Sequence, residues 1–142
     1  MTHEQLKLEN QLCFPFYAIS RLIIRKYQNL LNELGITYPQ YLVLLVLWET
    51  DYQPVNDISK RLFLNTNTIT PLIKRLEKLK IVKKEKGQDD ERKMYVKLTD
   101  KGLQLKEQAA QIPYKLVEGV DASKIDLIEL KISLDNMIGI LK

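Results

Sequence analysis

The stretch from Asp57 to Leu79 constrains the fold of this chain more than any other part of the sequence. Its second half repeats apolar residues at helical spacing, which places them on one side of a helix. These residues are Ile69, Leu72, Ile73, Leu76 and Leu79. Upstream, Ile58 and Leu62 indicate a shorter helix, and residues 64 to 67 are typical of a turn. The pattern therefore predicts two short helices joined by a polar turn, the order of a helix-turn-helix.

The opposite side of the second helix is polar. Its beginning carries Thr66, Asn67 and Thr70, and Lys74 and Lys78 follow further along. Short polar side chains at a helix start can reach base edges in DNA, whereas lysines one and two turns later reach phosphates. The segment is therefore predicted to bind double-stranded DNA. Two amphipathic helices of an ordinary bundle, with a solvated polar face, would produce the same pattern.

Positive charge is concentrated around the same segment. Between Val55 and Leu98 the sequence has twelve Lys or Arg and six Asp or Glu, a net charge of +6, whereas the rest has ten and twelve, a net charge of −2. A basic region on a slightly acidic frame is typical of a protein that binds phosphates. Charge alone would be weak evidence, and its coincidence with the helix-turn-helix pattern is what favours DNA.

Composition limits the remaining possibilities. A chain of 142 residues, 45% of them hydrophobic, fits one domain with helical extensions. The single cysteine, Cys13, excludes an internal disulfide and indicates a reducing compartment. No run of 18 apolar residues occurs, and the N-terminus does not resemble a signal peptide. We expect a cytoplasmic protein with no membrane partner.

Two helices are predicted before the helix-turn-helix. Apolar residues from Leu12 to Leu34 recur at steps of three and four, which predicts a long helix that ends at Gly35. A second helix is predicted from Thr37 to Thr50, because Thr37 and Gln40 have the spacing of a capping box. Its apolar residues face all directions, so we expect it to be central, with Trp48 in the core.

A hairpin is predicted after the helix-turn-helix. Residues 81 to 86 and 92 to 98 have the pattern of strands around a turn at residues 87 to 90. The residues expected to point inward from the second strand are Met94, Val96 and Leu98. A hairpin beside a helix-turn-helix is called a wing. The wing can carry Arg92 into the DNA minor groove, and Asp90 can orient its guanidinium. A weak surface ion pair beside a turn is the alternative.

The C-terminal part is predicted to be helical. Thr99 is expected to cap a helix that runs to about Ile112, where Pro113 perturbs it, and a last helix follows Asp121 or Ser123. The first helix and the last two carry surplus apolar surface, which implies a homodimer. Two copies would set their recognition helices about 34 Å apart, as a palindromic operator requires. The predicted fold is mainly α with a small β-hairpin wing: one domain, with a winged helix-turn-helix at 36–99 between dimerisation helices at 1–35 and 100–142.

Four segments resemble a known family. DERKMYVKLTDKG, from Asp90 to Gly102, and NTNTITPLIKRLEKL, from Asn65 to Leu79, are similar to the wing and recognition helix of MarR-type winged-helix regulators. KLENQLCFPFY, from Lys7 to Tyr17, and ITYPQYLVLLVLWE, from Ile36 to Glu49, resemble the organic hydroperoxide sensors of that family, the OhrR repressors. The resemblance implies a homodimeric repressor that leaves its operator when its one cysteine is oxidised by an organic hydroperoxide.

The resemblance also implies roles for particular residues. The sensing cysteine would be Cys13, and the phenols of Tyr17 and Tyr27 would hydrogen-bond to it across the dimer interface. The DNA contacts would be Thr66, Asn67, Thr68, Thr70, Asp90 and Arg92, to which the basic pattern adds Lys74 and Lys93. Two residues depart from the family pattern. Asn65 stands where an acidic residue is common, and Pro15 could kink the first helix or delay its start.

The chemistry expected at Cys13 follows from its neighbours. At about 100° per residue, Tyr17 and Tyr27 lie about 40° to either side of Cys13 around one helix, and contact within one chain or between chains stays open. The helix dipole favours a thiolate, which attacks a peroxide and becomes a sulfenic acid. Phe14 and Phe16 favour an organic hydroperoxide over hydrogen peroxide. Without a second cysteine, the next step would be a mixed disulfide with a low-molecular-weight thiol, or over-oxidation.

Three other functions stay open on the sequence. A related regulator that senses a small aromatic ligand would share the fold and the DNA contacts. A thiol peroxidase would need a turnover cycle, and neither an arginine or threonine near Cys13 nor a second cysteine supports one. A nonspecific architectural DNA protein would have no sequence preference. Because His3 is the only histidine, we expect no metal, cofactor or catalytic site, and the chain is not predicted to be an enzyme.

Overall fold

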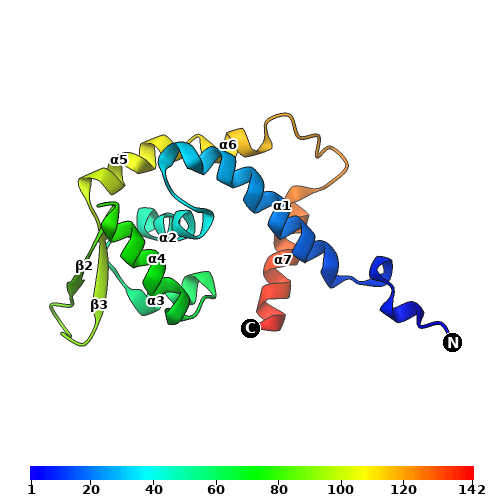
Figure 1. Cartoon of the computed structure of the whole chain (residues 1–142), viewed down its shortest axis with the longest axis horizontal. Helices are drawn as coiled ribbons and strands as arrows, with labels where there is room; N and C mark the ends of the chain where they lie inside the picture. Colours follow the sequence, from blue (N-terminus) through cyan, green and yellow to red (C-terminus); the bar gives the residue numbers. More distant parts are fainter.

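The computed structural model describes residues 1 to 142 and contains mostly helices around one small sheet (Figure 1). The main elements are α1 (Cys13–Leu31), α2 (Tyr38–Glu49), β1 (Gln53–Pro54), α3 (Val55–Leu62), α4 (Thr66–Lys78), β2 (Val82–Lys86), β3 (Met94–Leu98), α5 (Asp100–Ala109), α6 (Ile112–Val117) and α7 (Leu127–Leu141). Three short 3-10 turns are η1 (Glu4–Leu6), η2 (Leu8–Asn10) and η3 (Asn32–Leu34). The predicted fold class, mainly α with a small wing, is confirmed.

The first two helices begin near the predicted residues, but α1 ends at Leu31 and the short turn η3 fills the remaining residues before Gly35. Pro15 is the third residue of α1, where a helix needs no amide hydrogen, so it does not interrupt the helix. Gly35, with φ of 72°, closes η3 in the left-handed conformation. The predicted capping box begins α2: the Gln40 amide donates to Thr37 Oγ1 at 3.4 Å, and the Thr37 amide donates to Gln40 Oε1 at 2.9 Å.

The helix-turn-helix is present, with a shorter turn than the sequence predicted. Residues 66 and 67 were expected in the turn but lie in the first turn of α4, because the amides of Thr68 and Ile69 donate to the Asn65 carbonyl at 2.9 and 3.0 Å. Four of the five predicted apolar residues are buried, namely Ile69, Leu72, Ile73 and Leu76. The fifth, Leu79, follows the last residue of α4 and is exposed.

The wing is the hairpin of β2 and β3, paired from Val82 opposite Leu98 to Lys86 opposite Met94. β1 adds a third antiparallel strand beside β3, which the sequence did not predict. Val96 and Leu98 point inward as expected, whereas Met94 is exposed. The ring of Tyr95 stacks on Tyr52 at 4.6 Å and approaches Gly87 so closely that a Cβ there would lie 2.6 Å from it. Gly87 is thus required where the hairpin turns.

The C-terminal helices differ from the prediction at two boundaries. Thr99 caps α5, since its Oγ1 accepts from the Gly102 amide at 3.1 Å, but α5 ends at Ala109 and α6 begins at Ile112 around Pro113. The cap of α7 is Asp126, not Asp121 or Ser123. Its carboxylate accepts from the amides of residues 128 and 129 at 3.1 Å, whereas the Asp121 carboxylate accepts from the Ser123 amide in a separate turn.

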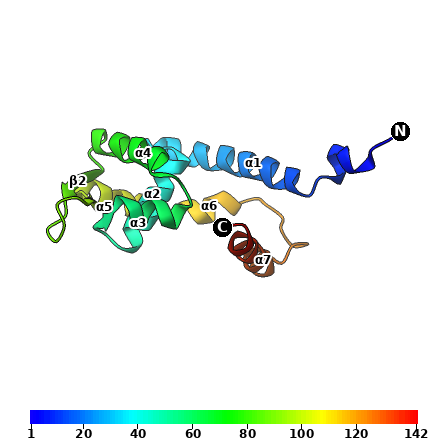
Figure 2. The ribbon, with the colours of Figure 1, turned by 90° about the horizontal axis from the view of Figure 1, so that it is seen from below.

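The hydrophobic core lies entirely between Leu31 and Ile112. α2 is central to it, as predicted. Trp48 packs against the core only partly buried, and its Nε1 donates to the Gly102 carbonyl at 3.0 Å. Figure 2 shows that α1 extends away from this core and that α7 lies apart from it. No single helix is both long and apolar enough to cross a membrane; residues 13–34 with α2 pass that test only as a pair bent by 72°.

Candidate nucleic-acid interface and cysteine site

The outward face of α4 carries the predicted DNA contacts. Thr66, Asn67, Thr68, Thr70 and Lys74 are all exposed, while the apolar residues of the same helix are buried. The helix is held firmly from behind, because Glu77 accepts the Lys84 amide of β2 at 3.4 Å and pairs with its ammonium at 3.5 Å. A helix fixed in this way presents hydroxyl, amide and ammonium groups in a set arrangement.

The wing presents a cation near its tip. Arg92 is 91% exposed, and its Nε and backbone amide donate to Asp90 Oδ1 at 3.2 and 3.0 Å. These bonds from the amide and the guanidinium hold the pKa of Asp90 below its ordinary value, so the carboxylate stays ionised. The predicted orientation of Arg92 by Asp90 is therefore present. Lys93 follows beside it, and its carbonyl accepts from the Gly87 amide at 2.8 Å.

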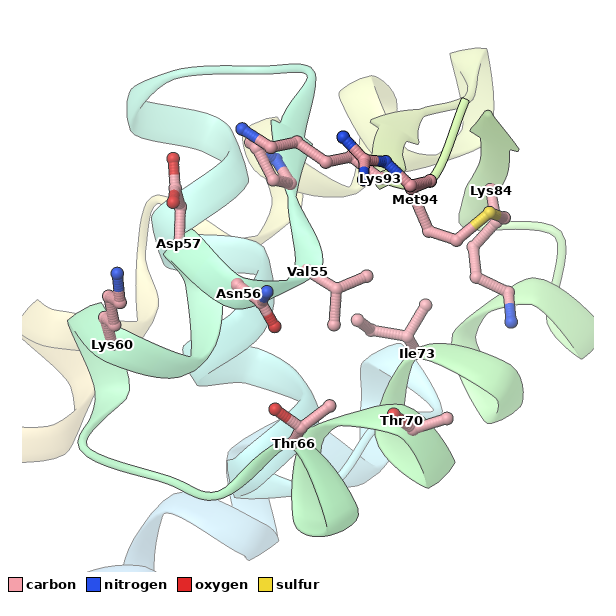
Figure 3. Close-up of a pocket in the computed structure, with 12 residues that line it drawn as sticks. Val55, Asn56, Asp57, Lys60, Thr66, Thr70, Ile73, Lys84, Lys93 and Met94 are labelled. Atoms are coloured by element: carbon pink, nitrogen blue, oxygen red, sulfur yellow. The ribbon is translucent and has the colours of Figure 1, made fainter. Parts of the chain in front are cut away.

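A cavity of about 470 Å³ lies between the helix-turn-helix and the wing (Figure 3). Val55, Ile73 and Met94 form its apolar part, and Thr66 and Thr70 reach it from α4. The cations around it are Lys60, Lys84, Arg92 and Lys93, against one carboxylate, Asp57. The structure thus brings four predicted contacts to one basic face, namely Thr66, Thr70, Arg92 and Lys93, and Asp90 pairs with Arg92 beside them. Lys60 and Lys84 were missed because only the tertiary fold brings them there.

The three predicted sensing residues do not meet within one chain. Cys13 is exposed at the first turn of α1. Tyr17 is 62% exposed, one turn further on, with the Arg21 guanidinium 5.6 Å from its ring centre. Tyr27 lies 14 residues beyond Cys13, about 21 Å along a helix that rises 1.5 Å per residue. The phenol of Tyr27 therefore cannot reach the thiol of its own chain.

Tyr27 belongs instead to a cluster of aromatic rings between α1 and α2. Its ring centre lies 4.7 Å from Tyr38 and 5.7 Å from Tyr41, and Tyr41 lies 6.2 Å from Trp48. Burial raises the pKa of Tyr27 and of Tyr38, so both phenols stay protonated hydrogen-bond donors. The sequence pattern did not single out Tyr38, which is the first residue of α2.

The fold and the two sites define a winged helix-turn-helix transcriptional regulator: an outward polar helix, a basic wing and flanking helices around one core. The family model of the transcriptional regulators SarA/Rot matches residues 25–109. The chain belongs to this family. The organic hydroperoxide resistance transcriptional regulator of Bacillus subtilis is 42% identical over 131 residues, 92% of this chain and 89% of that protein. The predicted likeness to organic hydroperoxide regulators is confirmed.

Solved structures of a second relative, AbfR, cover nearly the whole chain. Reduced AbfR bound to DNA is 42% identical, with a TM-score of 0.75 over 97% of this chain and 99% of that one. Overoxidised AbfR bound to DNA is also 42% identical and has a TM-score of 0.74, over 96% of this chain and 99% of that one. The disulfide form of AbfR is 41% identical and has a TM-score of 0.64, over 96% of this chain and 95% of that one. The chain is thus less similar in shape to the disulfide form than to the other two.

Proposed function

We propose that this protein is a homodimeric repressor that binds a palindromic operator and releases it when organic hydroperoxide oxidises Cys13. The observation that carries the proposal is the place of Cys13, the only cysteine, exposed within an apolar helix face that the chain itself leaves uncovered. The proposal is supported by the likeness to a hydroperoxide resistance regulator and to a regulator whose DNA-bound and disulfide forms differ. We place its action in the cytoplasm, as a stoichiometric sensor without catalytic turnover.

A second copy of the chain is the partner that fits the uncovered face. α7 buries no residue, and Ile128 and Ile140 are 76% and 80% exposed. Leu22 and Ile24 on α1 are exposed too. Apolar surface of this extent on two helices is typical of a protein interface. In a two-fold symmetric dimer, the same surface of each subunit covers that of the other. The dimerisation helices are therefore assigned to residues 1–35 and 100–142, around the DNA-binding unit at 36–99.

Because the distance along α1 excludes contact within one chain, we propose that the phenol of Tyr27 reaches Cys13 from the other subunit. Two-fold symmetry then requires the reverse contact as well, so the two α1 helices run antiparallel. Cys13 and Tyr27 lie equally far from residue 20, which places the crossing at Ser20, a small residue that allows close approach. In a Cys13→Ser background, Ser20→Cys should form a disulfide-linked dimer under mild oxidant, and the loop variant Ser123→Cys should not. A dimeric protein whose Ser20→Cys variant stays unlinked would contradict this arrangement.

The sensing chemistry balances with one hydroperoxide and one small thiol. The Cys13 thiolate attacks a peroxide oxygen, the S–O bond forms, the O–O bond breaks, and the alcohol leaves with a proton. A low-molecular-weight thiol then attacks the sulfenic sulfur, a disulfide forms, and water leaves. Because overoxidised AbfR remains bound to DNA in its structure, we assign release to the thiol adduct. A bulky adduct between subunits would turn the winged units apart.

The test follows the mass of Cys13 and the bound DNA in the same samples. Protein on operator DNA is exposed briefly to an organic hydroperoxide, with and without a small thiol, and analysed by intact mass and gel shift. We expect the fraction of DNA released to rise with the fraction of Cys13 that carries the thiol adduct. The adduct should lower the affinity for DNA about 5- to 150-fold, a coupling free energy of ~1 to 3 kcal/mol. Release without any modification of Cys13 would refute the proposal.

The cavity on the basic face supports a second candidate function. A small anionic aromatic compound bound among Lys60, Arg92 and Lys93 would occupy the surface that DNA needs. Such a regulator would release DNA without oxidant, and its Cys13→Ser variant would respond like the wild type. Titration of both proteins with phenolic acids distinguishes this function from oxidant sensing.

A further inference from the structure

One residue on the outward face of α4 is explained neither by the fold nor by the proposed phosphate contacts. Pro71 is the sixth residue of this 13-residue helix, well inside it. A proline there offers no amide hydrogen to the carbonyl of Asn67, and its ring crowds that carbonyl. Proline is the residue that an α-helix interior tolerates least. A function on the exposed surface would account for its presence.

The direction of Pro71 follows from its neighbours. Ile69, Leu72, Ile73 and Leu76 are buried and so define the inward side of α4. At about 100° per residue, Pro71 lies within about 30° of the opposite direction. Asn67 precedes it by one turn on the same face, and Lys74 and Lys78 follow. All four are exposed, and Pro71 is the apolar one in their middle.

A structural role does not account for this position. Pro71 is exposed and does not belong to the buried core or to the hydrophobic residues packed against it. It is not at the first turn of the helix, where proline would help to start it. Its ring presents only CH groups and no hydrogen-bond donor. The chemistry that it can offer to DNA is therefore apolar contact.

The major groove has one apolar feature, the 5-methyl group of thymine. We propose that Pro71 contacts a thymine methyl group in each half of the operator and thereby selects an A·T pair at that position. The inference rests on the proposed function, in which α4 lies in the major groove. Asn67 and Thr70 would read polar base edges, while Pro71 would read the methyl group.

The test removes the methyl group and the proline separately. DNA duplexes selected by the wild-type protein from a random pool are remade with deoxyuridine at single thymines. We expect one thymine per half-site whose replacement weakens wild-type binding about fourfold, the effect of one buried methyl group. Pro71→Ser should bind the two duplexes equally, and the short side chain of Pro71→Ala should leave at most a weak methyl preference. The control Lys78→Ala should weaken binding to both and keep the methyl preference.

The fold of the variants is checked by thermal unfolding. Pro71→Ala restores an amide hydrogen and a good helix former, so its unfolding temperature should not fall, and Pro71→Ser serves as a second variant. The inference would be overturned if the wild-type protein were insensitive to the loss of every methyl group. It would also be overturned if the variants lost as much affinity as the wild type when the same thymine is replaced. A wild-type protein that selects no sequence at all would instead overturn the proposed function.

Discussion

The winged unit and the helices that flank it are built in opposite ways. Between Leu31 and Ile112 the chain buries a continuous hydrophobic core, whereas no residue before or after this range is fully buried. A unit that completes its own core holds its surface groups in fixed positions. Apolar helices without a core depend on a partner for their place. Under the proposed function, the DNA-reading surface is therefore made within one chain, and the sensing site between two.

Breaking the dimer should have the largest effect. Leu130, 43% exposed on α7, should be buried between subunits, so Leu130→Asp is expected to give a monomer. Operator affinity should fall about 100-fold or more, because the two recognition helices no longer bind as one unit. Analytical ultracentrifugation and gel shift measure both effects.

The matched control is an equally exposed leucine within the winged unit. Leu45 on α2 is 41% exposed, and Leu45→Asp should remain dimeric with full affinity. If both variants stayed dimeric, α7 would not belong to the interface, and the division of the molecule into two kinds of region would be lost.

Removing the wing cation should have a smaller effect. Arg92→Ala is expected to weaken operator binding about tenfold, since a contact to the negative minor groove is lost. The slope of log affinity against log salt concentration should become shallower by about one per subunit. Fluorescence anisotropy at several salt concentrations measures both quantities. Lys131→Ala, which removes a cation from α7, should change neither, and an Arg92→Ala affinity equal to the wild type would exclude the wing from binding.

The smallest effect is expected from a phenol at the junction of the two regions. Tyr27→Phe keeps the ring that packs against Tyr38 and removes the hydroxyl that is proposed to reach Cys13 of the other subunit. The reduced variant should bind DNA normally, whereas Cys13 should react with hydroperoxide two- to threefold more slowly, roughly one weak hydrogen bond. Thiol titration against time measures the rate. Tyr114→Phe, at an exposed phenol of α6, is the control, and equal rates in the two variants would remove Tyr27 from the sensing site.

The sequence predicts the elements that depend on local chemistry. The capping box at Thr37, the left-handed Gly35 and the two long strands of the wing follow from short-range patterns, and the structure contains all of them. The basic face was also predictable, because α4 and the wing are close in sequence. These features need no knowledge of distant contacts.

The remaining features depend on tertiary packing. β1 has two residues, Gln53 and Pro54, which are too few to show alternation, and it is a strand only because β3 lies beside it. Three possible caps precede α7, and the sequence alone does not select Asp126. The spacing of Cys13 and Tyr27 predicted a shared helix face, but contact within one chain is ruled out only because one unbroken helix, α1, spans both residues.

The most direct test of the central claim compares wild type and Cys13→Ser on the same operator DNA. Each is titrated with an organic hydroperoxide in the presence of a small thiol, and bound DNA is followed by anisotropy. The account predicts that the wild type dissociates, with affinity falling about 5- to 150-fold, while Cys13→Ser stays bound throughout. Equal dissociation of the two proteins would contradict it.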